Sequence, residues 1–223
     1  MAVNGDKKSP EFFPKAGTAA VIVAHPDDET LWAGGTMLMH PETKWTIITL
    51  CRKSDADRAP KFFRVVKEYG AAGFMGDLDD SPDANKKPLD GKLVKRTIMD
   101  LLPEKSFDVI ITHSISGEYT RHLRHEETGS AVLELWREGE LSAGRVFTFA
   151  YEDGLMQYLP RAIEGADLFT QLPAKVWRKK YEIITSLYGF GKDSFEARTT
   201  PGQEAFWLKN KTGNTGSKKE SGQ

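Results

Sequence analysis

The sequence has little cysteine, no long hydrophobic run and no excess of charge of one sign, and each of these absences excludes a class of protein. Its 223 residues include a single cysteine, Cys51, so no disulfide can form within the chain, as is usual in a reducing compartment. The longest apolar run near the start covers residues 19–24 and is far shorter than the roughly 20 residues of a membrane helix. Lysine and arginine number 31 against 32 acidic residues, whereas nucleic-acid-binding domains usually carry a basic excess. We therefore expect a cytoplasmic protein without integral membrane association and without a nucleic-acid partner.

The two ends of the chain are polar. Residues 1–15 have no apolar stretch of signal-peptide length, and residues 210–223 contain no hydrophobic residue. A chain of this length commonly folds as one α/β domain. We expect a polar leader over residues 1–15, a single domain over residues 16–209 and a disordered tail over residues 210–223.

Four hydrophobic segments predict the strands of a buried sheet. They are TAAVIVAH at residues 18–25, WTIITLC at 45–51, FDVIITH at 107–113 and RVFTFAY at 145–151. These runs are too continuously hydrophobic for strands with one face in solvent. Between them, apolar residues recur at helical spacing within residues 62–69, 94–102 and 131–136, which predicts a mostly parallel sheet with helices on both faces. Beyond residue 151 the weaker pattern predicts one helix within residues 173–188 and a short strand over residues 204–208.

Polar residues follow three of the predicted strands. His25 ends the first strand, residues 51–58 follow the second, and residues 113–127 follow the third. The carboxyl ends of parallel strands meet at one edge of a sheet, so these loops converge there. Of the five histidines, His25, His122 and His125 lie in these loops, and His113 ends the third strand. We expect a single ligand site at this edge.

Three consecutive acidic residues, Asp27, Asp28 and Glu29, come directly after the first strand in the stretch HPDDE. Adjacent carboxylates repel one another, which predicts a positive group nearby. Imidazole and carboxylate are common ligands of catalytic Zn²⁺, which keeps three protein ligands and one open position. Alone, the acids could equally complement the start of a helix, and the two histidines of HLRH could lie on its surface. Together, at two strand ends of one sheet, the two motifs indicate a metal site.

The hexapeptide AHPDDE at residues 24–29, followed by GEYTRHLRHEE at residues 117–127, resembles the LmbE-like or PIG-L family of zinc-dependent N-acetylglucosaminyl deacetylases. AHPDDE is the signature of this family and stands in its usual position. The resemblance extends in outline from about Thr18 to Tyr151. It implies a Rossmann-like α/β fold, a deacetylase domain over residues 16–209 and Zn²⁺ as the cofactor, with another divalent metal as the alternative. Because family members often form trimers or hexamers, it also makes a homo-oligomer an option.

The resemblance assigns roles to the residues of the site. It implies that His25, Asp28 and His125 are the metal ligands. Asp27 would be the general base that takes a proton from a zinc-bound water, and His122 would stabilise the developing oxyanion or assist as an acid. These roles agree with the chemistry of the groups, because zinc lowers the pKa of a bound water to about 7 and a protonated imidazole stabilises an oxyanion.

Three further residues are candidates for substrate binding. Arg58 matches a family arginine at the start of the helix after the second strand, although the family's glutamate three residues later is Lys61 in this chain. Tyr119 is the candidate for the family's active-site tyrosine. Glu29 is a candidate substrate contact or a support for the neighbouring site residues. The alternative is that it only complements the start of a helix, where an acid needs no further role. We expect substrate choice to depend on the loops at residues 76–90, 114–121 and 152–175.

Other polar residues are expected to be structural. Arg121 and Arg124 should lie in solvent, and His113 should be a hydrogen-bonded histidine at a strand end. The acidic segment at residues 77–83 predicts a solvated loop, with a place near the rim of the site as an option, because it lacks the spacing and the terminal glutamate of an EF-hand. Cys51 should be a small buried side chain. No GxGxxG follows the first strand, which disfavours a nucleotide-dependent oxidoreductase.

The sequence therefore predicts a zinc-dependent hydrolase that removes the N-acetyl group from an N-acetylglucosamine-type sugar or its conjugate. Its partner would be a small-molecule amino sugar, and its products would be acetate and a free amine. One alternative is an amidase that cleaves another acyl group or a thiol conjugate from a glucosamine. Another is a non-catalytic sugar-binding protein, which the intact Asp27 disfavours.

Overall fold

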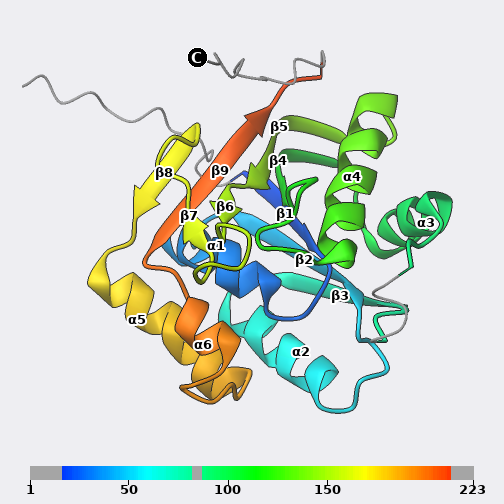
Figure 1. Ribbon diagram of the computed structural model, residues 1–223. Coiled ribbons are helices and arrows are strands. Elements are labelled where there is room, and N and C mark those ends of the chain that lie inside the picture. Colours follow the sequence, from blue (N-terminus) through cyan, green and yellow to red (C-terminus); the bar gives the residue numbers. More distant parts are fainter. Residues whose placement is uncertain (1–16, 82–86, 212–223) are drawn as a thin grey trace, which may run out of the picture.

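The computed structural model describes residues 17–81 and 87–211, which form a seven-stranded sheet, a two-stranded ribbon and the surrounding helices (Figure 1). The strand order in the large sheet is β3-β2-β1-β4-β5-β9-β8. Strands β1 to β5 pair in parallel, whereas β9 runs antiparallel to β5 and β8 runs antiparallel to β9. The predicted leader and residues 212–223 of the predicted tail lie outside the described residues.

Strands and helices alternate along the chain as far as β5. The strands of the large sheet are β1 (Thr18–Val23), β2 (Lys44–Cys51), β3 (Ala72–Leu78), β4 (Ser106–Thr112), β5 (Ser142–Phe149), β8 (Leu168–Gln171) and β9 (Gln203–Lys209). The ribbon pairs β6 (Tyr151–Glu152) with β7 (Arg161–Ala162). The helices are α1 (Asp28–Met39), α2 (Arg58–Glu68), α3 (Gly91–Leu101), α4 (Leu123–Glu138), α5 (Ala174–Glu182), the π-helical η2 (Ile183–Leu187) and α6 (Phe195–Thr199).

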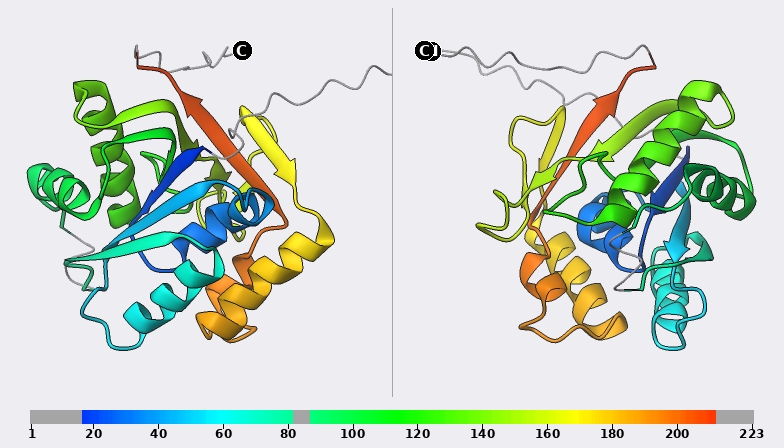
Figure 2. Two further views of the ribbon diagram at one scale, coloured as in Figure 1. Left: turned by 180° about the vertical axis from the view of Figure 1, so that it is seen from behind. Right: turned by 45° about the vertical axis from the view of Figure 1, so that its right-hand side comes forward.

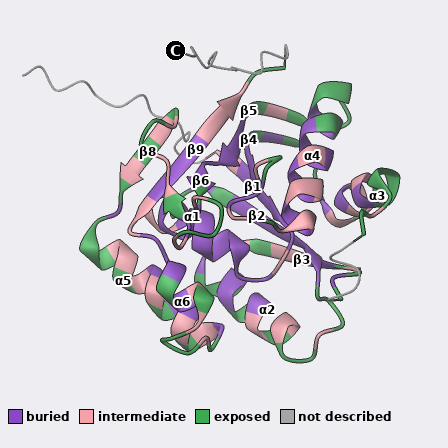
Figure 3. Ribbon diagram, viewed as in Figure 1, coloured by how far each residue is buried: buried purple, intermediate pink, exposed green. Residues whose placement is uncertain are grey.

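Helices cover both faces of the sheet and create two hydrophobic cores (Figure 2). On one face, α1, α2 and η2 contribute the fully buried Trp32, Phe62 and Ile184. On the other face, α3 and α4 contribute Ile98 and Val132. The central strands are buried on both sides, as Figure 3 shows, which explains why their sequences are continuously hydrophobic. The predicted Rossmann-like α/β fold, with a mostly parallel sheet and helices on both faces, is confirmed.

The order of the strands determines where the two sequence motifs meet. β1 lies between β2 and β4, and the helix that follows β1 packs on the opposite face from the helix that follows β4. In open α/β sheets, ligands bind at the carboxyl ends of strands where the connections diverge in this way. HPDDE follows β1, and HLRH follows β4 at the start of α4, so both motifs lie at this position.

All four predicted strands and the three helices between them are present, and the short strand near the end of the chain is β9. The helix expected within residues 173–188 is α5 followed by η2. The hydrophobic pattern does not predict β3, because Gly73 and Gly76 interrupt it. A Cβ atom on Gly76 would lie 2.7 Å from the carbonyl oxygen of Leu50, so the close approach of these strands requires glycine. The ribbon, β8 and α6 are also not predicted, because they lie where the pattern is weak.

Candidate metal and catalytic site

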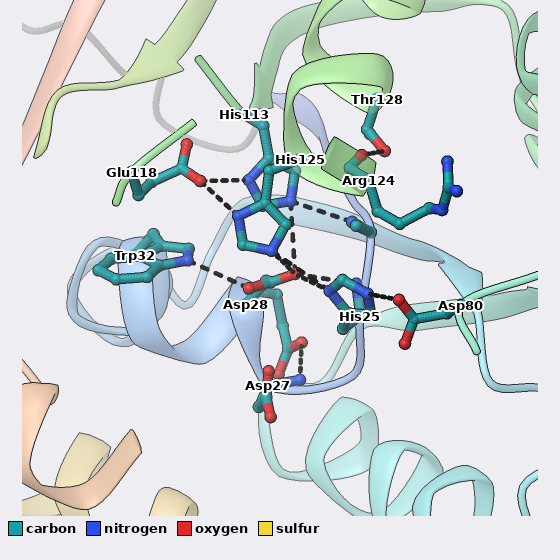
Figure 4. Close-up of polar contacts among 12 residues, drawn as sticks. His25, Asp27, Asp28, Trp32, Asp80, His113, Glu118, Arg124, His125 and Thr128 are labelled. Atoms are coloured by element: carbon teal, nitrogen blue, oxygen red, sulfur yellow. Dashed lines mark hydrogen bonds and ion pairs between the residues drawn. The ribbon is translucent and has the colours of Figure 1, made fainter. Parts of the chain in front are cut away.

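The three predicted ligands converge at the carboxyl end of β1 (Figure 4). His25 lies in the turn after β1, Asp28 begins α1, and His125 lies in the first turn of α4. His25 Nδ1 is 3.2 Å from both Asp28 Oδ2 and His125 Nε2, and these last two atoms are 3.3 Å apart. Ligand atoms about 2.0–2.1 Å from a tetrahedral zinc ion are about 3.3 Å from one another. The three atoms therefore fit one face of a zinc coordination tetrahedron.

Asp28 is held as an ionised group. Asp28 is buried. Its Oδ2 accepts a hydrogen bond from the backbone N–H of His25 at 2.8 Å, and its Oδ1 accepts one from Trp32 Nε1 at 3.2 Å. Burial alone would raise the pKa of Asp28, but His125 and His113 hold this pKa well below its usual range. A carboxylate that stays ionised between imidazoles is suited to bind a divalent cation.

Glu118 fixes His125 from the side opposite Asp28. Its Oε2 accepts hydrogen bonds from Nδ1 of His125 at 2.7 Å and from Nδ1 of His113 at 2.8 Å. A carboxylate on the far nitrogen of a metal-binding histidine sets the tautomer and orientation of the ring. Burial would raise the pKa of Glu118, but the two histidines lower it to about 2. The sequence does not single out Glu118, whose only signal is its place in the GEYTRHLRHEE segment.

His113 supports the site from the end of β4. Its Nε2 accepts the backbone N–H of Ala24 at 3.0 Å, and its Nδ1 bonds to Glu118. His113, Asp28 and His125 form a second group with the spacing of metal ligands. However, a backbone amide can only donate, so the Nε2 lone pair of His113 is engaged and is not free for a metal. The expectation of a hydrogen-bonded histidine at a strand end is confirmed.

His122 stacks on His125 beside the convergent ligands. The two ring centroids are 4.4 Å apart, and the ring of His25 lies 4.6 Å from that of His122. Burial, together with His125 and His25, lowers the pKa of His122 to about 3. A lowered pKa favours the neutral ring, whereas the oxyanion role expected from the sequence invokes a protonated imidazole. Within the described residues its Nδ1 is buried without a hydrogen-bond partner, and a neutral ring can still donate one hydrogen bond.

Asp27 lies next to the ligands in a strained backbone conformation. Its φ of 121° is unusual for a residue other than glycine, and such conformations cost of order 1–3 kcal/mol. Its N–H donates to Glu29 Oε2 at 3.0 Å, and its Oδ2 accepts from Arg58 Nη1 at 2.9 Å. Burial and the charge of Asp28 raise the pKa of Asp27 well above its usual value. A raised pKa suits a carboxylate that acts as a general base near neutral pH.

A cavity of about 140 Å³ lies against these groups. Its lining includes the predicted ligands His25 and Asp28 together with Asp27 and His122. Two arginines, two aromatic residues and two more acids also line the cavity: Arg52, Arg58, Tyr119, Phe195, Asp80 and Glu196. The cavity thus places charged groups of both signs around the predicted reaction centre.

The three predicted substrate contacts differ in position. Arg58 and Tyr119 line the cavity. Glu29 does not line it, because its side chain is fully buried and its Oε1 accepts a hydrogen bond from the Tyr188 hydroxyl at 2.7 Å. Its other oxygen supports the Asp27 backbone, as described above. The guanidinium of Arg58 lies over the ring of Phe190, 4.4 Å from its centroid, and this contact helps to orient the side chain.

Two expectations about charged residues are wrong. Arg124 is 1 % exposed rather than solvated, because it pairs with Glu127 and donates to the carbonyl oxygen of Lys87. Asp80, in the segment expected to be a solvated loop, is also buried and lies beside His25. Residues 82 and 83 of that segment lie outside the described residues. Arg121 is exposed as expected and pairs with Glu126, and Cys51 is buried as expected.

The C-terminal part of the chain adds Phe195 and Glu196 to the cavity wall. Both belong to α6, and the Phe195 ring contacts that of Tyr119 edge to face, with centroids 5.1 Å apart. Phe195 is 39 % exposed, although large aromatic side chains are usually more buried. The sequence carries no signal for these two residues, since they follow a segment with weak periodicity.

The fold and the convergent His/Asp cluster define an α/β protein with a candidate metal site at the carboxyl edge of its sheet. Residues 20–136 match the family model described as PIG-L: GlcNAc-PI de-N-acetylase. This match covers more than half of the chain, which therefore belongs to the PIG-L family of deacetylases, a family of amide hydrolases. The resemblance inferred from AHPDDE and GEYTRHLRHEE is confirmed.

Solved structures of deacetylases share the fold. An N,N'-diacetylchitobiose deacetylase from Pyrococcus horikoshii, complexed with its inhibitor MPG, has a TM-score of 0.68 at 13% identity, with 92% of this chain and 88% of that chain covered. The zinc-inhibited form of teicoplanin deacetylase Orf2 has a TM-score of 0.57 at 14% identity, with 86% and 97% covered. The uncharacterized protein L374 of Acanthamoeba polyphaga mimivirus is 22% identical over 178 residues, which are 74% of this chain and 75% of that protein. In the described part of the chain, no helix is long and apolar enough to cross a membrane.

Proposed function

We propose that the chain is a zinc-dependent hydrolase that removes the acetyl group from an N-acetylated amino sugar or its conjugate and releases acetate and a free amine. The observation that carries this proposal is the convergence of His25 Nδ1, Asp28 Oδ2 and His125 Nε2 within 3.3 Å of one another, beside the Asp27 carboxylate. The PIG-L family match and the deacetylases that share the fold support the same class of reaction.

In this proposal His25, Asp28 and His125 hold the metal. Zinc, when bound, lowers the pKa of a water and polarises a carbonyl oxygen. Asp27 takes the proton from the attacking water and passes it to the departing amine, a role for which its raised pKa is suited. Arg58 holds the Asp27 carboxylate in place through the hydrogen bond at 2.9 Å.

The remaining groups of the cavity bind and orient the substrate. The neutral His122 donates a hydrogen bond to the oxygen on which negative charge develops, and Tyr119 lies next to it with ring centroids 6.0 Å apart. Phe195 offers an apolar surface to one face of a sugar ring. Arg58 and Tyr119 are the predicted substrate contacts that reach the cavity, whereas Glu29 supports Asp27 from behind.

The test is to measure metal content together with acetate and amine release for wild type, Asp27→Asn and the exposed control Asp79→Asn. Wild type should bind about one zinc ion per chain and release acetate from N-acetylglucosamine or a small conjugate of it. Asp27→Asn should keep the metal and lose about 10²–10⁴-fold in kcat, the usual contribution of a positioned general base. The control should behave as wild type.

Other outcomes would separate the alternatives. Wild type without metal after reconstitution would refute the metal site. Full activity in Asp27→Asn would refute the role of Asp27. Release of a longer acyl group or of a thiol conjugate, without deacetylation, would indicate the amidase alternative, and sugar binding without turnover would indicate a binding protein.

A further inference from the structure

Asp80 is buried next to the proposed metal centre. It follows β3 and is 9 % exposed. Its Oδ1 lies 3.1 Å from His25 Nε2, the ring nitrogen opposite the one that faces Asp28 and His125 (Figure 4). Its Oδ2 accepts hydrogen bonds from Arg52, from Nε at 2.9 Å and from Nη2 at 2.6 Å. The Asp80 carboxylate therefore connects a proposed metal ligand to a guanidinium group at the rim of the cavity.

The backbone brings Arg52 and Asp80 together. Arg52 directly follows β2 and has a φ of 72°, a left-handed conformation that residues other than glycine rarely adopt. The pairing of β2 with β3 shifts its register at Cys51, which lies opposite Leu78. Just beyond, the Lys53 N–H donates to the carbonyl oxygen of Gly76 at 3.0 Å. These contacts join the ends of β2 and β3, so the sheet backbone positions Arg52 and Asp80 for their ion pair.

Asp80 lies 3.1 Å from the far nitrogen of His25, a placement similar to that of Glu118, which accepts a hydrogen bond at 2.7 Å from the far nitrogen of His125. In both cases a carboxylate lies at the ring nitrogen that does not face the other ligands. Glu118 is fully buried, whereas the side chain of Arg52, which anchors Asp80, is 44 % exposed. A carboxylate in this position fixes the tautomer and ring orientation of a metal-binding histidine, and its loss weakens metal binding.

We propose that Asp80, anchored by Arg52, is a positioning residue for His25. It favours the tautomer with the proton on Nε2 and directs Nδ1 toward Asp28 Oδ2 and His125 Nε2. This inference rests on the metal centre of the proposed function. Because Asp80 acts through His25, its loss weakens metal binding itself, which a residue that only contacts substrate does not do.

The test measures zinc affinity of the full chain by competition with a chromophoric chelator. Asp80→Ala should bind zinc about 10–100-fold more weakly than wild type, the usual loss for such a carboxylate. Asp80→Asn should lose less, because an amide oxygen can still lie against the N–H at His25 Nε2, although the negative charge is lost. Asp79→Ala is the matched control, because Asp79 is the exposed neighbour of Asp80. Its zinc affinity should equal that of wild type. The visible spectrum of the cobalt(II)-loaded protein should change in Asp80→Ala and not in the control.

Arg52→Ala provides a second variant at an exposed side chain. It should reduce zinc affinity by a smaller factor than Asp80→Ala, because Asp80 then loses its anchor but keeps its contact with His25. Thermal unfolding of the metal-free variants checks that they fold. Wild-type zinc affinity in both Asp80→Ala and Arg52→Ala would overturn the inference, and so would a raised KM for substrate with unchanged zinc affinity. Failure of wild type to bind zinc would refute the metal centre itself, which distinguishes this result from failure of the inference.

Discussion

Replacing Arg58 by alanine should move the acidic limb of the activity profile to higher pH. Arg58 Nη1 donates to Asp27 Oδ2 at 2.9 Å. Burial and the charge of Asp28 raise the pKa of Asp27, and the cation of Arg58 opposes them. Without that cation the pKa of Asp27 rises further. A general base works only when it is deprotonated, so activity on the acidic side should fall.

The size of this shift follows from the exposure of the pair. The side chains of Arg58 and Asp27 are 29% and 11% exposed, so solvent screens their interaction in part. Pairs of this kind contribute up to about 1 kcal/mol. Since one pKa unit corresponds to about 1.4 kcal/mol, we expect the limb to shift upward by about 0.7 pH units.

The assay is kcat/KM for acetate release by the zinc-saturated enzyme, because its pH dependence reports the groups of the free enzyme. In Arg58→Lys the limb should shift upward by less than in Arg58→Ala, since lysine keeps the charge but not the planar group over Phe190. Arg121→Ala removes an exposed arginine and should leave the limb unchanged. An acidic limb that stays in place, or moves to lower pH, in Arg58→Ala would refute the assignment of Asp27 as the base held by Arg58.

Three further predictions concern the parts around the site. Lys180 and Glu204 form a fully buried ion pair at 2.8 Å, so Lys180→Met should lower the free energy of unfolding by about 3 kcal/mol and Tm by about 6–12 °C in thermal denaturation. Phe195→Ala should raise KM for the amino sugar about 3–10-fold with kcat and zinc content unchanged, whereas Phe169→Ala, a phenylalanine of similar exposure on β8, should change none of these. Burial would raise the pKa of Asp153, but hydrogen bonds from the backbone and from Thr120 lower it below 3.8. The ionised carboxylate therefore stabilises the fold above pH 3.8. The difference in urea-unfolding free energy between wild type and Asp153→Asn should shrink as the pH falls below 3.8.

Each of these predictions has a contrary result. If the free energy of unfolding of Lys180→Met were within about 1 kcal/mol of the wild-type value, the N–H donors of α1 would be sufficient to stabilise Glu204. An unchanged KM in Phe195→Ala would exclude Phe195 from the substrate site. A difference between wild type and Asp153→Asn that stays constant with pH would show that the carboxyl group is not ionised in those hydrogen bonds.

The convergence of the candidate ligands could be predicted because these residues form short motifs at strand ends. Continuous hydrophobic runs identify β1 and β4, and parallel pairing brings the residues after them together. His25 and His125 thus become neighbours although 100 residues separate them. The chemistry of imidazole and carboxylate then suggests a metal, and the structure places the three donor atoms at the spacing that zinc requires.

The groups that support the ligands could not be predicted in the same way. Asp80 lies in an acidic segment whose composition is typical of a solvated loop. Its burial depends on β3, which the sequence does not predict because glycines interrupt the hydrophobic pattern of that strand. Glu118 faces inward only because α4 begins just after its loop and directs His125 toward it. For Arg124, burial depends on a partner carboxylate and a backbone carbonyl that the local pattern does not reveal.

Phe195 and Glu196 lie outside the residues that match the family model, yet they share a cavity with Asp27 and His25. The proposed reaction centre and part of the cavity wall are therefore encoded in different portions of the chain. Lys180 and Glu204 link these portions, because Glu204 also accepts the N–H groups of Gly35 and Thr36 in α1. Under the proposed function, substitutions in the last quarter of the sequence can thus alter which substrate is accepted while the proposed metal ligands stay the same.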